Sequence, residues 1–126
     1  MSSTELGRVR GLGSAKHGAH HWWHQRLTAG ANLVLMLWLV VSLVMLPDYS
    51  HGTVAAWLSS MWVAIPMVLL IANLFYHIRL GLQVVIEDYA HAEMHIVLMI
   101  LLNAFVFIGA AIGIFSVLRL ALGAAA

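Results

Sequence analysis

Two titratable side chains, His77 and Arg79, are placed where they could carry out chemistry in an apolar setting. His77 lies within positions 49–78, the longest stretch without Lys, Arg, Asp or Glu, and Arg79 directly follows it. A neutral imidazole can bind haem iron through one ring nitrogen while the other is hydrogen-bonded. Gly81, one helical turn later, would let a flat macrocycle approach, and Arg79 could neutralise a propionate or snorkel to the membrane surface. The alternative stays open, because one histidine does not specify haem: both side chains could simply hydrogen-bond between helices.

A tyrosine and a carboxylate follow the same stretch. On a helix, Asp88 would lie about 20° from the direction of His77, and Tyr89 about 120° away. A tyrosine hydroxyl at the membrane boundary could donate a hydrogen bond to a quinone carbonyl, and Asp88 could orient it. The alternative is a tyrosine of the aromatic belt beside solvated acids.

Four histidines near the N-terminus have the spacing of one helical face. Histidines at i, i+3, i+4 and i+7 could bind zinc or copper. No cysteine accompanies them, and Gly18 weakens a helix at this point. We therefore favour a peripheral polar segment over a metal site. The four residues are His17, His20, His21 and His24.

The composition indicates that these residues lie in a membrane protein. Hydrophobic residues make up 63% of the 126-residue chain, charged residues 9%, and the mean hydropathy is +0.94. A soluble fold of this size cannot bury so much apolar surface. The absence of cysteine excludes an iron–sulfur cluster, a thiolate haem ligand and a disulfide within the chain. The net charge of +1 argues against nucleic-acid binding.

Three stretches without charged residues predict an all-α fold with three transmembrane helices. A bilayer core about 30 Å thick requires roughly 20 apolar residues as helix. We place the spans near Leu27–Leu46, Val54–Glu87 and Met94–Leu120, between a polar segment at 1–26 and a short tail at 121–126. The second span, about 51 Å long as one helix, must tilt or project from the bilayer, and Pro66 could kink it.

Basic residues predict the orientation of the chain. The segment 1–26 carries four of them, whereas the loop at 47–53 carries none. The positive-inside rule therefore places the N-terminus in the cytoplasm.

Gly109 and Gly113 form a G-x-x-x-G pair that permits close helix approach. The small size of the bundle suggests a partner subunit.

The second stretch also resembles a known family. His77, Gly81 and Gln83, followed by Asp88-Tyr89, are similar to the second helix of the D-type membrane anchor of succinate dehydrogenase, especially in alphaproteobacterial and mitochondrial members. Residues 18–20 (Gly-Ala-His) and 25–29 (Gln-Arg-Leu-Thr-Ala) also resemble that family. The resemblance runs from about Gly11 to Leu120.

The resemblance implies a subunit of respiratory complex II in the bacterial inner (cytoplasmic) membrane. Its partners would be a flavoprotein carrying FAD, an iron–sulfur protein, and a second (C-type) anchor packed against this chain. The chain itself would carry neither FAD nor iron–sulfur clusters and would not be catalytic alone. Ubiquinone would be the substrate reduced at the membrane.

The resemblance also implies roles for individual residues. His77 would be one axial ligand of haem b, and the second anchor would supply the other. Tyr89 would bind the quinone, with Asp88 behind it. His20 and Arg26 match positions near the haem propionates. Arg79 matches no motif position, so its propionate role rests on spacing alone.

Two other functions remain open at this stage. One is the anchor of a fumarate reductase, in which the same chemistry runs in the opposite direction. The other is a histidine-rich metal-binding or transport protein, or a small structural membrane protein. A transporter needs several polar residues that meet at mid-membrane, and the few present here are scattered: Asn32, Asn73, His77, Arg79 and Asn103.

Overall fold

The fold is entirely helical in the part of the chain that the structure describes. The structure, a computed structural model, describes residues 4–9 and 17–123. Within these residues no strand is present, which confirms the predicted fold class. The helices are α1 (Glu5–Val9), α2 (Gly18–Val44), α3 (His51–Ser59), α4 (Met61–Tyr89) and α5 (Ala92–Gly123).

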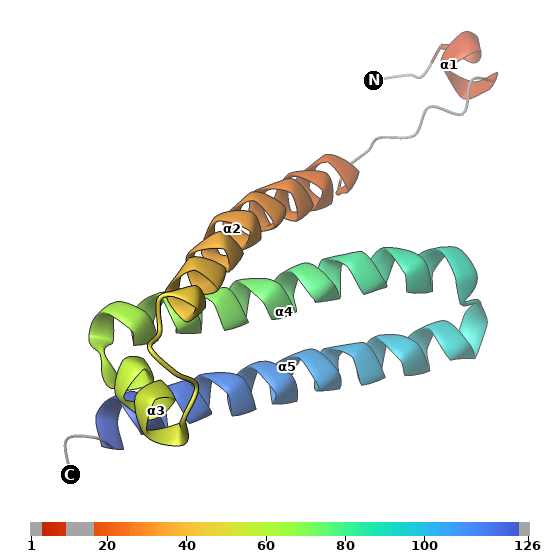
Figure 1. The fold of residues 1–126 in the computed structure, drawn as a ribbon. Helices are drawn as coiled ribbons and strands as arrows, with labels where there is room; N and C mark the ends of the chain where they lie inside the picture. The colour runs from red at the N-terminus through yellow and green to blue at the C-terminus, as the bar shows by residue number, and fades with distance from the viewer. Residues whose placement is uncertain (1–3, 10–16, 124–126) are drawn as a thin grey trace.

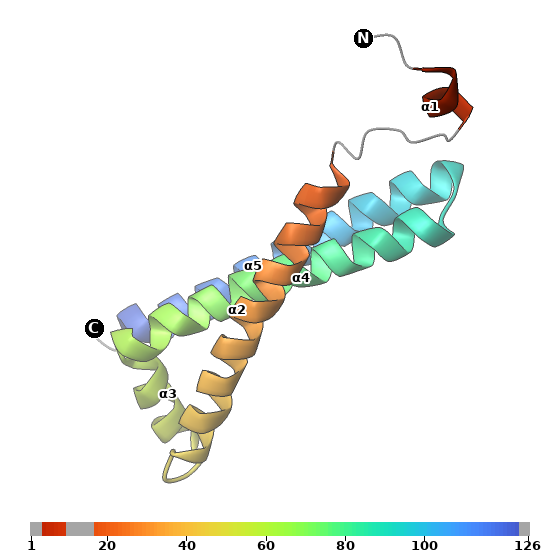
Figure 2. The ribbon, with the colours of Figure 1, turned by 90° about the horizontal axis from the view of Figure 1, so that it is seen from above.

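Three of these helices are long and apolar enough to cross a membrane: α2 with 27 residues, α4 with 29 and α5 with 32. Their apolar side chains point in all directions, as expected where lipid or a partner surrounds a helix. Only α4 packs against both of the others (Figures 1 and 2). It forms an antiparallel hairpin with α5, while α2 crosses its other side. The protein is therefore a multi-pass membrane protein.

The segment that we expected to form one helix near Val54–Glu87 is divided. Ser60 has an extended backbone (φ −72°, ψ 129°), which ends α3 and begins α4. The backbone N–H of Ser60 donates to the carbonyl of Trp57, and its carbonyl accepts the first bonds of α4. The break therefore occurs at Ser60, whose side chain makes no capping hydrogen bond, rather than at Pro66, which lies inside α4. The separate helix α3 packs against α4 and α5.

The first long helix begins earlier than the predicted span. α2 starts at Gly18, whereas the apolar stretch starts at Leu27. Gly18 is the first residue of α2, so the helical cost of glycine, about 1 kcal/mol in a helix interior, does not prevent the helix from beginning there. The additional turns carry the histidines at positions 20, 21 and 24 on the same helix as Thr28. The division of the chain into membrane and water segments stays a prediction.

The two glycines of α5 are where the hairpin is tightest. A Cβ atom on Gly109 would lie 2.5 Å from the ring of Phe75, and one on Gly113 would lie 3.1 Å from Ile71. Both contacts are with α4, so the G-x-x-x-G pair brings α4 and α5 of this chain together. The predicted close helix approach is confirmed, and the helix that approaches α5 is α4 of the same chain.

Candidate functional site

The candidate site lies where α2 crosses α4. His77 of α4 and Thr28 of α2 are joined by a hydrogen bond of 2.9 Å between Nδ1 and Oγ1. Thr28 is buried, with 7% of its surface exposed, and His77 is half-buried. The structure therefore places His77 in the interface between two membrane helices.

The hydroxyl of Thr28 fixes which nitrogen of His77 carries the proton. Its oxygen lies 2.7 Å from the carbonyl oxygen of His24 and 3.1 Å from that of Gln25. A hydroxyl has one hydrogen, and both carbonyls can only accept. With that hydrogen donated to the backbone of α2, the Thr28 oxygen accepts from His77, and this network assigns the proton to Nδ1 and the lone pair to Nε2. This is the tautomer of a histidine that binds a metal through Nε2 while its other nitrogen is held by the protein.

Two asparagines extend the polar contact along the same crossing. The side chain of Asn73, one turn before His77, donates to the backbone carbonyl of Thr28 at 2.9 Å and to Oδ1 of Asn32 at 2.8 Å. Asn32 is the other buried polar residue of the described chain. Hydrogen bonds between membrane helices contribute about 0.6 kcal/mol each on average. The contacts therefore set the register of α2 against α4 and hold His77 in place.

A pocket of about 210 Å³ opens between the first turns of α2 and the later turns of α4. Tyr76 lines it, and its hydroxyl lies 2.7 Å from Nδ1 of His24. The ring of His24 lies 4.1 Å from that of His20. Arg79 and His20, two of the predicted propionate residues, both line this pocket. Its other lining residues are His17, His21, Leu80 and Gln83.

Arg79 also reaches the opposite side of α4. Its Nε donates to Oδ1 of Asn103 on α5 at 2.7 Å, and Asn103 in turn donates to the carbonyl of Met99. Among the described residues, no carboxylate lies within ion-pair distance of Arg79. Arg79 lies within the predicted second span, where a guanidinium without a counter-charge is costly. Arg79 is therefore suited to an anionic group from outside this chain.

The structure does not bring Arg26 to this crossing. Arg26 is exposed, and its guanidinium lies 5.3 Å above the ring of Trp22. It lines a separate groove with Leu27 and Gly30. Two positions before Thr28, it lies about 200° around the helix from the residue that contacts His77.

Asp88 and Tyr89 lie at the end of α4, apart from the crossing. Both are exposed, Tyr89 by 82%, and neither makes a side-chain hydrogen bond within the described part of the chain. Nearby, Gln83 donates to Glu87 at 2.8 Å. The chain thus presents the tyrosine hydroxyl outward, where a ligand or a partner could reach it.

The structure also bears on the two weaker predictions. Residues 4–9 and 17–123 contain no group of three or more His, Asp or Glu side chains able to hold a metal ion, and the peripheral role of His17–His24 stays a prediction. A Cβ on Gly81 would lie 3.6 Å from the Gln25 amide, an ordinary contact. Gly81 therefore lies beside the Gln25 side chain of α2, and the approach of a macrocycle at this position stays a prediction.

Three contacts of the candidate site were missed by the sequence analysis: those of Thr28, Asn73 and Tyr76. A signal for two of them was present. Thr28 and Asn32 stand four residues apart in the first apolar stretch, and Asn73 and His77 stand four apart in the second. Polar residues with this spacing share a helix face, and two such faces in membrane helices are expected to meet. Tyr76 carried no comparable signal.

Comparison with known proteins identifies the family. Residues 2–111 match the family described as "Succinate dehydrogenase/Fumarate reductase transmembrane subunit". The chain is 37% identical to the "Succinate dehydrogenase hydrophobic membrane anchor subunit" of Rickettsia bellii (strain RML369-C) over 86 residues, 68% of each chain. It is 34% identical to the "Succinate dehydrogenase membrane anchor subunit" of Reclinomonas americana over 85 residues, 62% of this chain and 68% of the relative. No solved structure matches the chain. The chain therefore belongs to the family of succinate dehydrogenase hydrophobic membrane anchor subunits.

Proposed function

We propose that this chain anchors a succinate:quinone oxidoreductase, respiratory complex II, and supplies one axial ligand of haem b and part of the quinone site. The observation that carries the proposal is the hydrogen bond of 2.9 Å between Thr28 and His77. It leaves Nε2 of a half-buried membrane histidine with a free lone pair. These residues fit a haem, because an axial histidine needs a fixed tautomer and a held ring.

Several residues of this chain would serve the haem. His77 would bind the iron, with Thr28 fixing its ring. Arg79 and His20, which line one pocket, would neutralise the propionates. Arg26 lies away from the α2–α4 crossing, beside Trp22. It would therefore contact a propionate only of a haem that extends past this crossing. When bound, haem supplies a one-electron redox centre.

Tyr89 and Asp88 would form this chain's part of the quinone site. The hydroxyl of Tyr89 would donate to a quinone carbonyl, and the bond would strengthen as negative charge develops on that oxygen. Asp88 would orient the tyrosine. The exposure of Tyr89 at the end of α4 supports this role, since the hydroxyl is not engaged by the described part of the chain.

The remaining subunits would be a second (C-type) anchor, an iron–sulfur protein and a flavoprotein with FAD. The second anchor would supply the other haem ligand and cover the exposed helix faces. The four basic residues before the first span support a cytoplasmic N-terminus. The relatives from Rickettsia support a place in the bacterial inner membrane. The relatives named as succinate dehydrogenase subunits favour succinate oxidation over fumarate reduction as the physiological direction.

The test is the substitution of His77. We expect the complex purified through a tag on this chain to show a b-type α band after dithionite reduction. His77→Ala should remove the low-spin bis-histidine signal in electron paramagnetic resonance, and His77→Tyr should alter it. Turnover need not stop, because clusters can deliver electrons to quinone directly.

The control is His91→Ala, which removes an exposed histidine between α4 and α5. Its spectrum should equal that of the wild type, and subunit stoichiometry should be measured for each variant. An unchanged low-spin signal in an assembled His77→Ala complex would refute the haem assignment.

A further inference from the structure

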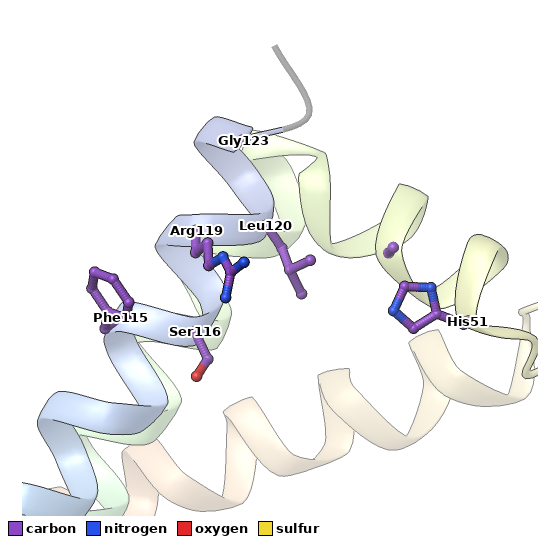
Figure 3. Close-up of a pocket in the computed structure, with 7 residues that line it drawn as sticks. His51, Phe115, Ser116, Arg119, Leu120 and Gly123 are labelled. Carbon is purple, nitrogen blue, oxygen red and sulfur yellow. The ribbon is translucent and has the colours of Figure 1, made fainter. Parts of the chain in front are cut away.

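A second polar site lies at the opposite end of the helical hairpin. A pocket of about 630 Å³ opens between α3 and the last turns of α5. Figure 3 shows His51 of α3 and Arg119 of α5 on opposite sides of it. Arg119 is sixteen residues beyond Asn103 along α5, which corresponds to about 24 Å. The pocket is thus separate from the site around His77 and Arg79.

The charges around this pocket favour an anion. Arg119 is the only Lys or Arg after Arg79, and among the described residues it has no carboxylate partner. α3 begins at His51, so the first N–H groups of that helix add partial positive charge nearby. The acidic residue closest in sequence, Asp48, does not line the pocket. Its carboxylate accepts from the backbone N–H of Ser50 at 2.8 Å, and hydrogen bonds from Ser50 and Thr53 hold its pKa below the usual 3.8.

The apolar surroundings indicate what kind of anion fits. Phe115, Leu120 and Ala55 line the pocket beside the two basic groups. Along the same helix Ile112 and Leu122 remain more than half exposed. The hydroxyl of Ser116 donates to the carbonyl of Ile112, so its oxygen can only accept a further bond. The pocket thus combines a cationic end with an apolar helix surface, at the point where a membrane helix ends.

We propose that this pocket binds the phosphate headgroup of an acidic phospholipid, with its acyl chains along the exposed face of α5. Arg119 pairs with the phosphate, and His51 closes the opposite side. Ser116 accepts a hydrogen bond from a headgroup hydroxyl. A free phosphate ion offers the same charge but has no chains to occupy the apolar surface.

The experiment measures retained lipid in the membrane complex purified through a tag on this chain. The complex is loaded in phosphatidylcholine nanodiscs that contain a minority of phosphatidylglycerol, and then transferred to pure phosphatidylcholine. Phosphatidylglycerol retained per complex is counted by mass spectrometry. A basic residue near a membrane surface contributes about 1 kcal/mol to binding of acidic lipid, so Arg119→Gln should lower the affinity about fivefold. Arg119→Lys should retain more lipid than Arg119→Gln.

The control Arg8→Gln removes the same charge from α1 and should retain as much phosphatidylglycerol as the wild type. A second variant, His51→Glu, places a carboxylate opposite Arg119 and should exclude the lipid phosphate while leaving α5 unchanged. Wild-type retention in Arg119→Gln or in His51→Glu would overturn the proposal. Displacement of the retained lipid by inorganic phosphate at millimolar concentration would also overturn it, because a free ion would then be the preferred ligand.

Discussion

At the scale of single residues, Thr28 decides the chemical state of His77. Its hydroxyl accepts from Nδ1 only because its own hydrogen is committed to the backbone of α2. A hydrogen bond at the distal nitrogen of an axial histidine raises the basicity of the ligand. If His77 binds haem as proposed, this hydrogen bond would stabilise the oxidised iron relative to the reduced iron.

Thr28→Val is therefore expected to raise the haem midpoint potential, since the valine keeps the shape of the side chain but accepts no hydrogen bond. The N–H of the half-buried His77 would also lose its partner, which weakens the contact between α2 and α4. Thr28→Ser keeps the hydroxyl and serves as the matched control. Potentiometric titration of the α band measures the effect, and equal potentials in both variants would contradict the assigned tautomer.

Tyr89→Phe tests the proposed quinone donor at the same scale. The variant keeps the ring and should preserve assembly and haem, while quinone turnover falls by up to about 10²-fold, as for the loss of one oxyanion-site donor. Asp88→Asn should give a smaller defect if the carboxylate only orients the hydroxyl. Succinate oxidation with an artificial acceptor that takes electrons upstream should persist in both variants. If Tyr89→Phe reduces quinone at the wild-type rate across a range of quinone concentrations, the hydroxyl is not the quinone donor, and Tyr89 is a tyrosine of the aromatic belt.

At the scale of elements, the contact between Gly109 and Phe75 holds the α4–α5 hairpin together. Gly109→Ala would place a methyl group 2.5 Å from the ring, so the ring or the helix must move. Overpacking of this kind costs about 1–3 kcal/mol, and we expect a lower midpoint of thermal unfolding for the purified complex. Gly113→Ala should cost less, because its nearest atom, Cγ2 of Ile71, is 3.1 Å away, so a shift of a few tenths of an ångström suffices.

Gly30→Ala is the matched control within this chain, since nothing lies within 4 Å of its added Cβ. Phe75→Leu combined with Gly109→Ala should recover part of the lost stability by giving the methyl group room. A thermal midpoint of Gly109→Ala equal to that of Gly30→Ala would contradict the tight packing of α4 on α5.

The elements also show what the sequence could and could not predict. The three long helices and the close approach at Gly109 followed from charge gaps and spacing alone. The break at Ser60 did not, because no charged residue interrupts the apolar stretch and Pro66 was the more visible candidate. The pairing of Thr28 with His77 depends on which faces of α2 and α4 meet. That choice is made by tertiary packing, which hydropathy does not encode.

At the scale of the whole molecule, the chain buries little of itself. Apart from Thr28 and Asn32, its buried residues in the described part of the chain are all apolar. These apolar residues are Ala64, Leu70, Leu80, Leu102, Val106 and Val117. α2 packs on α4 but not on α5, so much of its surface has no helix against it (Figure 2). In lipid there is no hydrophobic driving force between helices, so packing and hydrogen bonds must hold them together, and α2 makes these with α4 alone.

The last prediction follows from this open arrangement and from the unpaired charge of Arg79. The chain is expected to be stable only within a complex, because partner helices would cover α2 and an anionic group would compensate the guanidinium. Purification through a tag on this chain should recover a flavoprotein, an iron–sulfur protein and a second anchor. Arg79→Gln removes the charge of the guanidinium and so tests whether an anionic group compensates it. If a haem propionate pairs with Arg79, the variant should assemble normally but show a shifted haem midpoint potential. Recovery of a stable tagged monomer without any partner would contradict the complex, because the exposed faces of α2 would then need nothing but lipid.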